Sequence, residues 1–169
     1  MASTIQDIYL TGLRNAHALE VQAIQLLERQ AERLENYPMM EARIREHIQE
    51  SRNQSARLED ILRTHGTSES TFKDVMTGLM GNVAAIAHVP MQDEVLKNSF
   101  ANFAFEHYEI ASYNALLQMA EAAGDAAAPA ALRQSLDEEV RMAQWIEQNL
   151  PEVVRTYMRL ETEGKTAGR

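Results

Sequence analysis

Glutamate side chains interrupt the apolar face of a helical segment. In residues 100–117, FANFAFEHYEIASYNALL, the side chains of Phe103, Ile110 and Leu117 recur at intervals of seven. Glu106 falls on the same face, and Glu109 lies one turn further on. An ionised carboxylate in a dry protein interior is costly unless it is paired. This stretch therefore predicts a cation or a proton beside Glu106.

Two further helical segments repeat this feature. Glu20 interrupts an apolar row in the first segment, and His17 lies one turn before it on nearly the same face. Glu139 interrupts the corresponding row in the last long segment. Arg141 is the nearest basic residue to Glu139 along the chain.

The second segment carries an imidazole in its row. His47 lies on the apolar side together with Gln54, and Glu50 stands beside both of them. Gln54 could offer an amide oxygen to a cation. Taken singly, His17 or His47 is interpreted more simply as a partly buried hydrogen-bonding group, and Glu50 or Glu109 as a solvated or salt-bridged one.

The carboxylates on four helices favour a metal site when they are considered together. Several buried carboxylates repel one another unless they take up protons or bind a cation. Lysine is absent from these rows. Carboxylates with an occasional imidazole suit iron or manganese. The sequence therefore predicts a pair of iron or manganese ions in the core.

The composition indicates one helical domain. The chain has 169 residues, of which 45% are hydrophobic, with seven glycines, four prolines and no cysteine. Few turn-forming residues favour long regular elements, and the lack of cysteine excludes disulfides and thiolate metal sites. The formal net charge is −9 without a basic cluster, so we do not expect nucleic acid binding.

The sequence shows neither a membrane span nor a secretory signal. No stretch approaches the roughly 18 uninterrupted apolar residues that cross a bilayer. The N-terminus lacks a basic region followed by an apolar run. We therefore expect a cytoplasmic protein that does not enter membranes.

Helical periodicity and turn signals divide the chain into four long helices and shorter pieces. A helix capped by Ser3 or Thr4 is expected, and Pro38 and Gly66 mark the start and end of the next one. The long helices are predicted at residues 5–35, 38–65, 91–123 and 130–149, with a shorter helix within 70–88. Pro151 should separate a short final helix. Residues 1–160 form the predicted domain, and residues 161–169 form a flexible tail.

This order of elements indicates an all-α, ferritin-like four-helix bundle. Two tight turns each join a pair of antiparallel helices, and a long helical crossover joins the pairs. A simple up-down-up-down bundle would not need the extra residues between the second and third long helices.

The chain also resembles the bacterial YciE/YciF ferritin-like stress proteins, and the YciE branch more closely. The resemblance covers nearly the whole chain and is carried by the stretches RNAHALEVQ, IREHIQESRNQSARLE, FEHYEIASY and LDEEVRMAQWIEQNLP, together with the turn ENYP. It implies a ferritin-like bundle, a homodimer, and a link to stress responses.

The resemblance also implies a set of ligands of the rubrerythrin type. That pattern has a glutamate on the first helix, Glu-x-x-His on the second and fourth, and Glu-x-x-Glu on the third. The residues that match it are Glu20, Glu50, Glu106, Glu109 and Glu139.

Two histidines of that pattern are absent. Asn53 follows Glu50 by three residues, and Met142 follows Glu139 by three. His47 is then the expected imidazole ligand, with His17 or Gln54 as alternatives. A vestigial site that holds protons and hydrogen bonds is the other interpretation.

Two classes of function fit these residues. One is a dinuclear metal protein that reacts with oxygen or peroxide, as a di-iron oxidase or peroxidase would, or that simply binds the metal. The other is a non-enzymatic stress protein that acts through its surface. Iron storage in a cage is a weaker third option, because assembly interfaces are not readable from the sequence.

Overall fold

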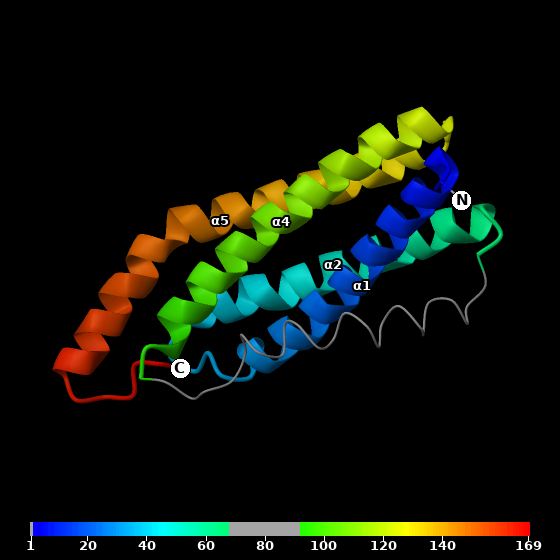
Figure 1. Ribbon diagram of the computed structural model, residues 1–169. Coiled ribbons are helices and arrows are strands. Elements are labelled where there is room, and N and C mark those ends of the chain that lie inside the picture. Colours follow the sequence, from blue (N-terminus) through cyan, green and yellow to red (C-terminus); the bar gives the residue numbers. More distant parts are fainter. Residues whose placement is uncertain (1, 68–91) are drawn as a thin grey trace.

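The protein is built from four long helices, seen in a computed structural model that describes residues 2–67 and 92–169 (Figure 1). They are α1 (Ile5–Ala31), α2 (Pro38–Thr64), α4 (Glu94–Ala123) and α5 (Ala128–Thr162). No β-strand occurs in these residues, which confirms the all-α prediction. The crossover helix predicted within 70–88 lies outside the described ranges.

Local signals in the sequence define most of the helix ends. Thr4 caps α1 through a reciprocal capping box with Asp7, and Pro38 occupies the first turn of α2. Gly66 and Gly124 follow α2 and α4 with φ angles of 72°. Glycine adopts this left-handed conformation without a steric penalty, so each of these helices ends where the chain must turn.

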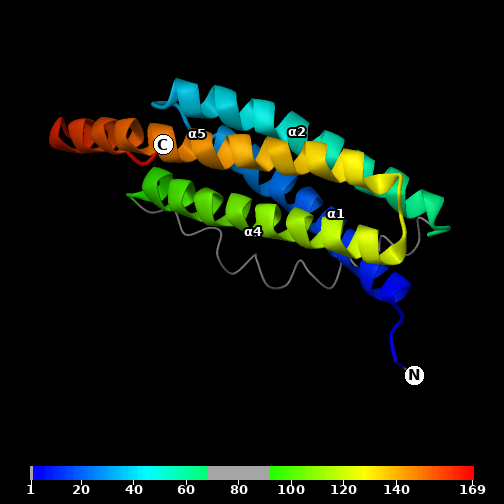
Figure 2. The ribbon, with the colours of Figure 1, turned by 90° about the horizontal axis from the view of Figure 1, so that it is seen from above.

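The helices pack as two antiparallel pairs. α1 contacts α2 and α4, and α5 contacts α4 and α2, so α2 and α4 lie diagonally opposite. α2 and α4 point in the same direction (Figure 1), and α4 lies beside α5 when the bundle is seen from above (Figure 2). The second and third long helices in chain order, α2 and α4, are thus parallel, whereas successive helices of an up-down-up-down bundle are antiparallel, so this order is that of a ferritin-like bundle. No helix in the described part is long and apolar enough to span a membrane.

Pro151 does not end the fourth long helix, contrary to the prediction. α5 continues through it to Thr162 and bends in its C-terminal half (Figure 1). A proline inside a helix removes one hydrogen bond and crowds the preceding turn. Val153 and Leu160 beyond it are buried in the core, and their packing holds the helix together.

The last residues of the chain contact the bundle. The Tyr37 hydroxyl donates to the Ala167 carbonyl oxygen at 2.6 Å, and the Val95 amide donates to the Gly168 carbonyl oxygen at 3.1 Å. The Ala167 side chain is buried. These contacts differ from the flexible tail expected over residues 161–169, of which the first two also belong to α5.

The buried face of α4 is rotated from the predicted apolar stripe. Glu106, Glu109 and Tyr113 are fully buried, whereas Phe103 and Ile110 are only partly buried at the edge. α4 contacts both α1 and α5, and the line that faces both of them runs beside the apolar stripe. The middle of this helix therefore presents polar side chains to the core.

The core consists of two apolar clusters with a polar layer between them. One cluster surrounds Ile44, Met142 and Ile146, and the other surrounds Leu13 and Leu58. Most of the buried polar residues of each helix fall between the two clusters, whereas Gln30 on α1 lies within the first one. The fold thus places the predicted glutamates in one layer across the middle of the bundle.

Candidate metal centre

Six polar side chains line the middle of this layer, and each of them is at most 1% exposed. They are Glu20, His47, Gln54, Glu106, Glu109 and Glu139. All six were singled out from the sequence. They come from all four helices, because each helix carries its polar residues at the level where the two apolar clusters end.

His47, Glu106 and Glu139 form the tightest group. Nε2 of His47 lies 3.2 Å from Oε2 of Glu106 and 3.6 Å from Oε2 of Glu139. Ligand atoms of these three residues all lie within 4.8 Å of one another. One imidazole nitrogen and two carboxylate oxygens converge on a point that a cation could occupy.

Glu20 and Glu109 are the other two glutamates among these six residues. The Tyr113 hydroxyl donates to Oε1 of Glu20 at 2.5 Å. Among the described residues, neither carboxylate oxygen of Glu109 has a hydrogen-bond partner. Buried polar atoms of this kind are rare and costly in folded proteins.

Other atoms in the layer also lack hydrogen-bond partners within the described part of the chain. They are Oε2 of Glu20, Glu106 and Glu139, Oε1 of Gln54, and Nε2 of His47. Oxygen donors with one imidazole are the set that iron and manganese accept. The residues present therefore fit the predicted metal pair.

The carboxyl groups of Glu109 and Glu139 hold their protons more strongly than exposed carboxyl groups do. Burial raises the pKa of Glu109, and the negative charges of Glu20, Glu139 and Glu106 raise it further. Burial also raises the pKa of Glu139, as does the charge of Glu106. A bound cation would reverse both effects, because it favours the ionised form.

Glu50 lies behind His47 and outside the central group. Its Oε2 is 2.9 Å from Nδ1 of His47 and 3.0 Å from the Arg43 guanidinium. The Glu50 side chain is 19% exposed. The structure thus brings His47, rather than Glu50, into the central group from α2.

The two alternative ligands have different surroundings. His17 pairs with Glu59 at 3.1 Å, away from the central group. Gln54 lies within the layer, and its amide nitrogen donates to Glu139 and, at 3.0 Å, to Glu138.

Sequence reasoning missed the partner of Glu138. This buried carboxylate receives two hydrogen bonds from the Arg57 guanidinium, at 2.7 and 2.8 Å. Arg141, which is the nearest basic residue to Glu139 along the chain, is exposed. The signal that could have indicated this pair is the position of Arg57, which lies one turn after Gln54 on the same face of α2.

Comparisons with known proteins agree with this architecture. A family model described as a domain of unknown function (DUF892) matches residues 4–159. Protein YciF of Escherichia coli K12 is 28% identical over 144 residues, which cover 80% of this chain and 84% of that protein.

Two solved structures are also similar. A Xanthomonas campestris pv. campestris protein gives a TM-score of 0.79 at 28% identity, covering 94% of this chain and 99% of that one. The E. coli stress protein YciF gives 0.69 at 25% identity, covering 87% and 94%. The resemblance to YciF is confirmed, whereas assignment to the YciE branch stays a prediction.

Proposed function

The chain belongs to the DUF892 family, and we propose that it is a ferritin-like, stress-associated protein that binds two iron or manganese ions in its polar layer. The observation that carries the proposal is the convergence of buried carboxylate oxygens and one imidazole nitrogen without hydrogen-bond partners in the described residues. The description of E. coli YciF as a stress protein supports the association with stress.

The ligands divide into two groups. His47, Glu106 and Glu139 would hold one ion, since their ligand atoms already lie within 4.8 Å of one another. Glu20 and Glu109 would hold the second ion beside it, and the Gln54 amide lies beside Glu139 of the first group. Bound ferrous iron would supply electrons for the reduction of dioxygen or peroxide.

Metal loading tests this proposal directly. The protein is purified without chelators, loaded anaerobically with excess ferrous iron or manganese, desalted, and measured by elemental analysis. We expect two ions per chain in the wild type and a clear loss in Glu106→Ala. Glu28→Ala should load normally, because Glu28 is a half-exposed residue paired with Arg52 on the surface.

A non-enzymatic protein with a vestigial site is the second candidate. Two contacts favour it: the Tyr113 hydroxyl donates to Glu20, and the Gln54 amide donates to Glu139. Raised carboxyl pKa values would let protons occupy the place of metal. Failure of the wild type to retain either metal would reject the metal protein in favour of this candidate.

A cytoplasmic homodimer is part of the same proposal. Phe100 and Tyr108 on α4 are 52% and 66% exposed, and large apolar side chains of this kind are frequent in subunit contacts. Sedimentation across micromolar concentrations tests this association. A monomer of 19.1 kDa at every concentration would contradict it.

A further inference from the structure

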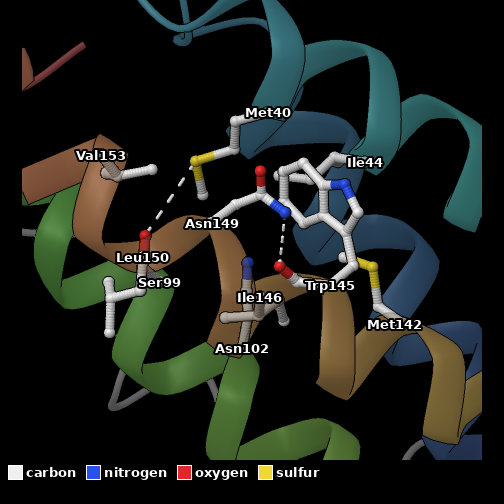
Figure 3. Close-up of a pocket in the computed structure, with 10 residues that line it drawn as sticks. All are labelled: Met40, Ile44, Ser99, Asn102, Met142, Trp145, Ile146, Asn149, Leu150 and Val153. Atoms are coloured by element: carbon white, nitrogen blue, oxygen red, sulfur yellow. Dashed lines mark hydrogen bonds between the residues drawn. The ribbon is translucent and has the colours of Figure 1, made fainter.

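Two cavities beside α5 lie in line between the surface and the polar layer. The outer one has a volume of about 170 Å³ and is bordered by the α1–α2 turn and by Trp145. The inner one has a volume of about 10 Å³, which is room for one water-sized molecule (Figure 3). The residues that line both cavities are Met40, Trp145, Asn149 and Val153.

The inner cavity lies next to the candidate metal centre. Its lining residues Ile44, Asn102 and Met142 come from three different helices (Figure 3). Each stands one helical turn from a residue of the central group. Ile44 precedes His47 by three residues, Asn102 precedes Glu106 by four, and Met142 follows Glu139 by three. The cavity and the centre are therefore separated by about one turn, roughly 5.4 Å along the bundle.

The lining of the inner cavity is uncharged and offers few donors. Among the described residues that border it, none is ionisable. Ser99 donates to the Val95 carbonyl oxygen at 2.7 Å, and Asn149 donates to the Trp145 carbonyl oxygen at 2.8 Å. An ion would lose its hydration here without compensation.

The amide of Asn102, which also lines the inner cavity, is paired inside the protein. The amide of Asn102 exchanges two hydrogen bonds with the amide of Gln30, at 2.8 and 3.2 Å. Peroxide would have to give up hydrogen bonds to water in this cavity, whereas dioxygen has none to lose.

We propose that these two cavities form the passage through which dioxygen reaches the metal centre. The proposal rests on the proposed function, because it assigns the small uncharged oxidant that the centre would meet. Metal ions would enter elsewhere, since the described residues that line the passage include no charged side chain beyond Glu152 at its mouth.

The metal-free protein gives a test that does not depend on activity. Dissolved dioxygen is paramagnetic and speeds the relaxation of methyl groups that it approaches, so the protein is labelled with ¹³C-methyl methionine. We expect faster relaxation of the methyl groups of Met142 and Met40, which line the passage, than of Met119, which is partly buried against the other apolar cluster. An effect at Met142 no larger than at Met119 would overturn the proposal.

Two variants change the width of the passage in opposite directions. Ser99→Val adds a methyl group to the inner cavity. It should reduce the relaxation of the Met142 methyl group by dioxygen roughly fivefold, which corresponds to about 1 kcal/mol in the free energy of access. Met40→Ala opens the junction and should increase this relaxation. Ser55→Val is the matched control, since Ser55 is buried on α2 and lines neither cavity.

Iron-loaded protein provides the second arm. Ser99→Val should slow iron oxidation by dioxygen while iron uptake stays normal, and Ser55→Val should change neither. If Ser99→Val and Met40→Ala take up iron normally and oxidise it at the wild-type rate, the passage is rejected and the metal-binding proposal stands. If the wild-type protein does not take up iron, the proposed metal-binding function is rejected instead.

Discussion

Nδ1 of His47 lies 2.9 Å from Oε2 of Glu50, so this carboxylate fixes which ring nitrogen faces the centre. The opposite nitrogen, Nε2, points toward Glu106. A carboxylate that holds the far side of a histidine orients the ring and raises its basicity as a metal ligand. Arg43 in turn holds Glu50 in place at 3.0 Å.

Glu50→Gln should therefore weaken metal binding by about 10–100-fold without abolishing it. The affinity is measured by competition with a chelator of known strength. Glu46→Gln is the control, since Glu46 pairs with the same Arg43 but its side chain is 70% exposed. A complete loss of metal in Glu50→Gln, like that expected for Glu106→Ala, would instead make Glu50 a ligand.

Two buried glutamates should affect stability in opposite directions. Both Glu109 oxygens lack partners among the described residues, so Glu109→Met should raise the unfolding free energy of the metal-free protein by about 1–4 kcal/mol. Glu138→Met should lower it by about 2–3 kcal/mol, because it leaves Arg57 without its buried partner. Urea denaturation of both variants checks this contrast. Destabilisation of the metal-free protein by Glu109→Met would contradict it.

The metal-free protein should lose stability as the pH rises above about 4.5. Burial raises the pKa of Glu20 from 4.5 to about 8, so the folded protein keeps a proton that the unfolded chain releases. Burial alone would lower the pKa of His47, but Glu106, Glu50 and Glu139 outweigh it and raise the value from 6.5 to about 10. The stability that His47 contributes is complete below pH 6.5 and is lost as the pH rises toward 10, so both groups act in the same direction.

Urea denaturation of the metal-free protein between pH 5 and 8 checks how its stability depends on pH. This range lies between the ordinary pKa of Glu20 and its raised pKa in the folded protein. Glu20→Gln should show a shallower slope because position 20 no longer titrates. Saturating metal should also flatten the slope, since the ion replaces the protons. An increase in stability with pH across this window would refute the prediction.

The contact between Tyr37 and the C-terminal residues should protect the start of α4. Tyr37→Phe removes the hydrogen bond to the Ala167 carbonyl oxygen and should cost about 1 kcal/mol. The Val95 amide, which donates to Gly168, should then exchange faster with deuterium. Tyr108→Phe, on an exposed side chain, is the control. Unchanged exchange at Val95 would mean that the tail docks without Tyr37.

The sequence alone determined most of the side chains that the helices turn toward the core, although the buried face of α4 runs beside the predicted stripe. Leu13, Glu20 and Leu27 share one face because a helix repeats every 3.6 residues, whatever packs against it. The same local geometry placed His47 and Gln54 together on α2, and Glu106 and Glu139 on the buried faces of α4 and α5. Local periodicity therefore predicted most of the candidate ligands, whereas Glu50 was also predicted and lies outside the central group.

Only the tertiary structure decided which buried charges are neutralised. Glu138 and Glu139 are neighbours in sequence, yet Arg57 pairs with Glu138, because α2 brings its guanidinium to that side of α5. The continuation of α5 through Pro151 likewise depends on the burial of Val153 and Leu160. These outcomes depend on contacts between helices distant in the chain, and a periodic pattern within one helix contains no information about its neighbours.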